Sequence, residues 1–212
     1  MTCKLCKPYA DCDWAHSDDW ERSASNYFQL LSEESETQLA IVRRADEISD
    51  SDPASAFQLY VEAAEAGSVC SMEKVGWLYW TGTGVVADTS TALEYYHRAI
   101  VGGSWMATIG YARLLTEVGR QNDCETVLKD GVALDFVPAY FWLAWLRYLQ
   151  ARTPKMRREV RPLLEHAARQ GHPAAKFFLS GWMARGQLSL LDVPRGWKWV
   201  VEEAVDFASR RA

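Results

Sequence analysis

Long apolar runs are missing from this 212-residue sequence. No segment approaches the ~20 consecutive apolar residues of a membrane-spanning helix, and the first residues contain no apolar stretch typical of a secretory signal. We therefore expect a cytoplasmic protein whose thiols are mostly reduced. With 49% hydrophobic and 24% charged residues, the composition is that of an ordinary globular chain.

Catalytic signatures are missing as well. The sequence contains four histidines and no nucleophile elbow, phosphate loop or dinucleotide fingerprint. His97 and His166 are predicted on two well-separated helices, which argues against a shared site. The sequence therefore predicts a binding protein, and an enzyme would need catalytic residues that the sequence does not reveal.

Charge is distributed unevenly along the chain, whose formal net charge is -5. Residues 1–73 are strongly acidic, whereas residues 147–161 are basic apart from Glu159. The basic run could bind an acidic partner, a phosphate or a membrane surface, or it could be a solvated loop. Because most of the molecule would repel a nucleic acid, we do not expect nucleic-acid binding.

Four turn residues recur at a nearly constant interval. Gly67, Gly103, Asp135 and Gly171 are separated by 36, 32 and 36 residues. Apolar or small residues lie three, four, seven, eight and eleven positions before each of them, and four, eight and eleven positions after. This spacing places them on one face of a helix. Each unit is thus predicted to contain a first helix, a turn with left-handed backbone geometry and a second helix.

Proline supports this division and marks one exception to it. Pro53 and Pro154 precede first helices, and Pro138 and Pro173 precede second helices, where a first-turn proline is well tolerated. Pro162 falls inside the first helix of the fourth unit, so we expect that helix to be irregular.

The residues from Ala56 to Val85 have the pattern A-x-x-L-Y-x-x-A-A-x-A-G-x-x-x-S-x-x-x-V-G-x-L-Y-x-x-G-x-G-V. This pattern resembles a Sel-one-like repeat, a relative of the tetratricopeptide repeat. The second unit keeps part of the pattern, the third replaces its glycine with Asp135, and the fourth matches again from His166 to Leu179. The resemblance covers roughly residues 51–205.

The resemblance implies an all-α, right-handed α-solenoid of helix-turn-helix repeats. We divide the chain into an acidic segment over residues 1–50, with capping helices from about Asp18 to Ile48, and a repeat solenoid over residues 51–212. Cys70 and Cys124 occupy non-equivalent positions in their repeats, so the disulfides of the cysteine-rich secreted subgroup are not expected, and both should be core residues.

The first residues contain the sharpest chemical pattern. Cys3, Cys6, Cys12 and His16 form C-x2-C-x5-C-x3-H, which has the ligand types of a tetrahedral structural zinc site. Zinc is therefore a candidate cofactor, and a zinc- or redox-responsive binding protein is the alternative function. The same residues could also form a tail whose cysteines have no common role.

Two surfaces are candidates for a partner. The inner wall of such solenoids is usually formed by first helices, whose flanking positions form a polar strip of mixed charge. This strip comprises Gln58, Glu62, Glu94, His97, Arg98, Glu125, Lys129, Arg161 and Glu165.

The second candidate surface is aromatic. Trp77 and Trp145 share one position of the second helices, and Trp80 and Tyr148 share the position three residues later. These side chains either pack between repeats or form hot spots for a partner. The sequence therefore predicts an interaction module that binds another protein or peptide, either as an adaptor or as a regulator.

Overall fold

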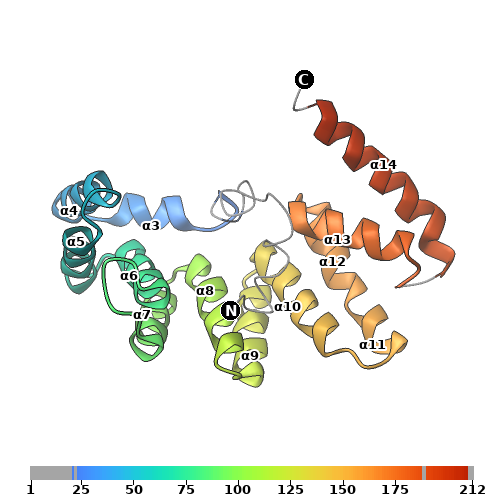
Figure 1. The fold of residues 1–212 in the computed structure, drawn as a ribbon, viewed down its shortest axis with the longest axis horizontal. Helices are drawn as coiled ribbons and strands as arrows, with labels where there is room; N and C mark the ends of the chain where they lie inside the picture. The colour runs from blue at the N-terminus through green and yellow to red at the C-terminus, as the bar shows by residue number, and fades with distance from the viewer. Residues whose placement is uncertain (1–20, 22, 188–189, 210–212) are drawn as a thin grey trace.

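The computed structural model describes residues 21, 23–187 and 190–209, and in these residues it contains helices and no strand. The α-helices are α3 (Tyr27–Glu33), α4 (Glu36–Ile48), α5 (Pro53–Glu65), α6 (Val69–Thr81), α7 (Thr89–Val101), α8 (Trp105–Glu117), α9 (Gln121–Ala133), α10 (Val137–Gln150), α11 (Pro154–Glu159), α12 (Arg161–Arg169), α13 (Pro173–Ala184) and α14 (Val193–Ser209). A 3-10 helix, η1 (Leu190–Asp192), precedes α14. Consecutive helices pack in pairs along a curved row, so the predicted all-α solenoid is confirmed (Figure 1).

The predicted turns have the predicted backbone geometry. Gly67, Gly103 and Gly171 have φ angles of 94°, 95° and 96°, and Asp135 has a φ of 55°. In this left-handed region glycine avoids a Cβ clash and Asp is among the better-tolerated alternatives. Each turn leads directly into α6, α8, α10 or α13.

Small residues allow close approach where two helices of one unit meet. A Cβ atom added to Gly131 on α9 would lie 2.7 Å from the Cβ atom of Ala139 on α10. No larger side chain fits between these two backbones without a shift.

The irregularity predicted at Pro162 is confirmed. The first helix of the fourth unit is divided into α11 and α12, which meet at Val160. Pro162 lies in the first turn of α12, where its missing N–H costs no hydrogen bond.

Helices α3 and α4 belong to the segment predicted to cap the repeats. Helix α4 ends at Ile48, as expected, and packs on α5 with Ala45 fully buried. Helix α3 packs on α6 and extends toward the middle of the row (Figure 1).

The expected position of the first helices was wrong. Second helices contact one another from unit to unit, α6 with α8 and α8 with α10. Figure 1 shows α3 on the side of α6 and α8, with α7 and α9 on the opposite side. In a curved row the inner helices are the ones that approach one another most closely, so the second helices form the inner face.

Candidate functional site

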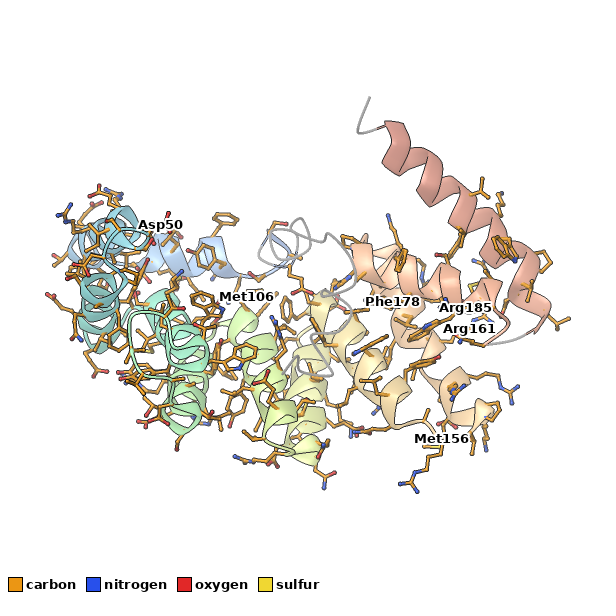
Figure 2. The ribbon with its side chains drawn as sticks, viewed as in Figure 1. Asp50, Met106, Met156, Arg161, Phe178 and Arg185 are labelled. Carbon is orange, nitrogen blue, oxygen red and sulfur yellow. The ribbon has the colours of Figure 1, made fainter. Side chains whose placement is uncertain are left out.

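A cavity of about 450 Å³ lies between α3 and α4 on one side and α6 and α8 on the other. It is lined by Glu21, Tyr27, Val42, Asp46, Tyr60, Cys70, Ser71, Glu73, Lys74, Trp77, Trp80, Tyr96, Met106, Ile109, Gly110 and Arg113. Figure 2 labels Met106, which lies at the end of α8 nearest α3. The inner face of the first two units is thus hollowed where α3 crosses it.

The α6 wall combines a cation with aromatic rings. Lys74 and Trp77 are three residues apart, so they share one face of the helix. The Lys74 Nζ atom lies 5.1 Å from the Trp77 ring centroid and 5.5 Å from that of Tyr60, within the range of a cation–π contact. Trp77 is 41% exposed, although it is a large apolar side chain. This part of the wall can therefore contact a bound molecule.

The α8 wall repeats this combination. The guanidinium carbon of Arg113 lies 5.0 Å from the Trp80 ring centroid and 5.9 Å from that of Trp142. The Trp80 Nε1–H group donates to Glu117 Oε2 at 2.7 Å, which links α6 to α8. These contacts hold the indole of Trp80 in a fixed orientation.

Two tyrosines in the lining remain neutral at physiological pH. Burial raises the pKa of Tyr60, and the hydrogen bond that its hydroxyl donates to Asp46 adds to this effect. Burial also raises the pKa of Tyr96. The charges of the cavity are therefore those of its lysine, arginine and carboxylate side chains.

The polar strip predicted on the first helices does not line this cavity. Several of its members form ion pairs with neighbouring helices. Arg98 Nη1 lies 2.7 Å from Glu65 Oε1, and Glu125 Oε1 lies 2.8 Å from Arg147 Nη2. The helices that carry the strip in the second and third units, α7 and α9, lie on the side of the row opposite α3 (Figure 1).

The four aromatic candidates separate into two groups. Trp77 and Trp80 line the cavity. Trp145 is 7% exposed and stacks on Trp182 at a centroid distance of 5.8 Å, while Tyr148 stacks on the same ring at 3.7 Å. We therefore assign Trp145 and Tyr148 to packing between α10 and α13. The sequence did not identify Tyr60 and Arg113 as cavity residues. The contact of Tyr60 with Lys74 and that of Arg113 with Trp80 form only in the folded chain.

The predicted metal ligands Cys3, Cys6, Cys12 and His16 lie outside the described residues. Within the described part of the chain, no group of three or more His, Cys, Asp or Glu side chains is placed to hold a metal ion. Among the same residues, no helix is both long and apolar enough to span a membrane. Cys70 and Cys124 are buried.

The Sel1 repeat model matches residues 46–68 and 71–103. The chain therefore contains Sel1 repeats over residues 46–103. The second match starts in α6 and ends just after α7, so the family's unit begins on the helix that we counted as second.

Solved structures show the same fold. A Sel1 repeat protein from Oxalobacter formigenes is 18% identical, with a TM-score of 0.64 over 78% of this chain and 73% of that one. The protective antigen c5321 of uropathogenic Escherichia coli is 15% identical, with a TM-score of 0.59 over 78% of this chain and 38% of that one. Immunity protein Pa5087 from Pseudomonas aeruginosa is 22% identical, with a TM-score of 0.52 over 71% of this chain and 60% of that one. No curated protein matches the sequence.

Proposed function

We propose that this protein is a non-catalytic interaction module that binds a partner protein on the inner face of its second helices. The observation that carries the proposal is the cavity beside α6, where Trp77 is exposed next to Lys74. Exposed aromatic side chains next to a cation are typical of the few residues that dominate a protein interface. Repeat solenoids also offer their extended inner surfaces to protein partners in general.

The chemistry of this wall defines the segment that fits it. The ammonium group of Lys74 attracts a carboxylate, and the indole of Trp77 covers apolar or aromatic surface. We therefore propose a partner segment with an acidic residue beside an apolar or aromatic one. One structural neighbour is named an immunity protein, and at 22% identity it shares the fold of this chain.

Comparative affinity purification with quantitative mass spectrometry tests the proposal. Trp77→Ala and Lys74→Glu change exposed or half-buried groups of the cavity wall. The matched control is Trp197→Ala, because Trp197 is 56% exposed but lies on α14. A second control, His97→Ala, changes the outer strip.

We expect the two cavity variants to recover a specific partner at roughly one tenth of the wild-type level or less, as for loss of a hot spot. Both controls should recover it at the wild-type level. Equal recovery by wild type and Trp77→Ala would contradict binding at this cavity.

A further inference from the structure

Glu21 and residues 23–35 cross the inner face of the solenoid, and we refer to them as the strap. The strap includes α3, and Figure 1 shows this helix leading from α4 toward the middle of the row. Its side chains contact three repeat units, and the contacted residues of these units are far apart in the sequence.

The first contact is at the start of α6. Ser68 is fully buried, and its hydroxyl donates to Glu34 Oε1 at 2.6 Å. The same hydroxyl oxygen accepts the backbone N–H of Ser71 and so caps α6. Glu34 therefore binds directly to the cap of a repeat helix.

The second contact is at the start of α8. The Asn26 side-chain amide donates to the Gly103 carbonyl at 2.7 Å, and its oxygen accepts the Trp105 backbone N–H at 3.1 Å. Asn26 thus satisfies two backbone groups on either side of the helix cap.

The third contact is buried between α10 and α13. Glu21 Oε1 lies 3.1 Å from Trp142 Nε1 and 3.2 Å from His172 Nε2, and Glu21 and His172 are 2% and 0% exposed. His172 Nδ1 accepts the Ala175 backbone N–H and caps α13. The imidazole proton is therefore on Nε2, and this atom donates to Glu21.

These three contacts follow the repeat. Ser68 and His172 each come directly after the turn of their unit, and Asn26 bonds the residues on either side of the equivalent Ser104. We propose that the strap is an internal ligand of the starts of the second helices. We further propose that an acidic helical segment of the partner protein binds the same helix starts by displacing the strap. This inference rests on the proposed function and specifies its partner.

Two physical features favour this exchange. The starts of second helices carry positive partial charge, which suits the carboxylate groups of an acidic segment. Helix α3 has seven residues, a length at which an isolated helix is not stable in water. Glu21 and Tyr27 also line the cavity, so release of the strap removes one side of its wall.

Hydrogen exchange of the full chain tests whether these contacts hold the strap. Because α3 unfolds once it is released, its amides should exchange about ten-fold faster or more in Glu21→Ala and in Asn26→Ala. Gln29→Ala is the matched control, since the side chain of Gln29 donates to Glu33 within α3 and the Gln29 carbonyl that accepts from Ser32 is kept in the variant. Unchanged exchange of the α3 amides in both strap variants overturns the inference. If Glu21→Ala does not fold, unchanged exchange in Asn26→Ala alone overturns it.

Binding of a labelled synthetic peptide with the sequence of residues 21–35 tests the ligand chemistry. The peptide should bind Asn26→Ala at least about ten-fold more tightly than wild type, whose own strap is present at millimolar effective concentration. A peptide in which the residues corresponding to Glu21, Asn26 and Glu34 are alanine should bind about ten-fold more weakly.

Absence of peptide binding, or equal binding of both peptides, overturns the inference. The peptide assay requires no partner, so it is independent of the Trp77 experiment. If the peptide binds but recovery of the partner does not depend on Trp77, the strap site is supported and the proposed function is rejected.

Discussion

At the scale of single residues, the inner face depends on glycines that make room for a neighbouring ring. A Cβ atom at Gly110 on α8 would lie 2.6 Å from Tyr96 Cζ, and Tyr96 is 2% exposed. The sequence identified the repeat position of Tyr96 as apolar but gave no sign that its ring covers Gly110, because the contact joins α7 to α8.

Gly110→Ala should lower the free energy of unfolding by about 1–3 kcal/mol, the usual cost of overpacking a core. Gly181→Ala is the matched control, because its added Cβ would meet only the end of the Arg185 side chain at 3.4 Å. That variant should be neutral or more stable by up to about 1 kcal/mol, since alanine favours helix more than glycine. Urea denaturation of both variants measures the difference, and equal destabilisation would contradict the packing described.

The cysteine pattern of the first residues also belongs to the residue scale, and zinc binding remains a prediction. Protein purified without chelator should contain close to one zinc per chain by plasma mass spectrometry, because three thiolates and an imidazole complete a tetrahedral site. Cys3→Ser/Cys6→Ser should reduce the metal content to background, whereas Cys124→Ser should not. Metal-free wild type would contradict the prediction.

At the scale of helices, periodicity predicted most of the fold. The 36-residue and 32-residue intervals identified the helix pairs, and Pro162 identified the break between α11 and α12. Periodicity shows which face of each helix is apolar, but both helices of a unit bury such a face. Which helix is inner depends on contacts between units, such as α6 with α8, and these were not visible in the spacing.

An ion pair between helices gives the fold a measurable pH dependence. The hydrogen bond from Arg147 on α10 lowers the pKa of Glu125 on α9 from its usual 4.5, with a smaller contribution from Lys129. Since the folded-state pKa is depressed, this stabilisation is present above pH 4.5 and is lost as the pH falls through the folded-state pKa.

Glu125→Gln should therefore be less stable than wild type at pH 7, by up to about 1 kcal/mol for a partly exposed pair. The two proteins should become similar near pH 3. Thermal unfolding at both pH values measures this convergence, with Glu94→Gln as a control on an exposed carboxylate of α7. A constant difference between Glu125→Gln and wild type at the two pH values would contradict the assigned pair.

At the scale of the whole molecule, the curved row of repeats has an inner face that is partly covered by its own strap. Sequence predicted a helical cap at the N-terminal side but not its path, because Glu21 and His172 are 151 residues apart. The sequence identified Trp77 and Trp80 as candidate partner-binding residues. The choice between a packing role and a binding role required the exposed fraction of each side chain. The partner surface that we propose is therefore on the second helices and not on the first helices.

Site-specific photo-crosslinking tests this central claim most directly. A photoreactive phenylalanine analogue would be placed at position 77 on the inner face or at position 97 on the outer face, both of which are exposed. We expect the partner recovered by affinity purification to form adducts from position 77 and none from position 97. Adducts from position 97 alone would contradict binding on the inner face.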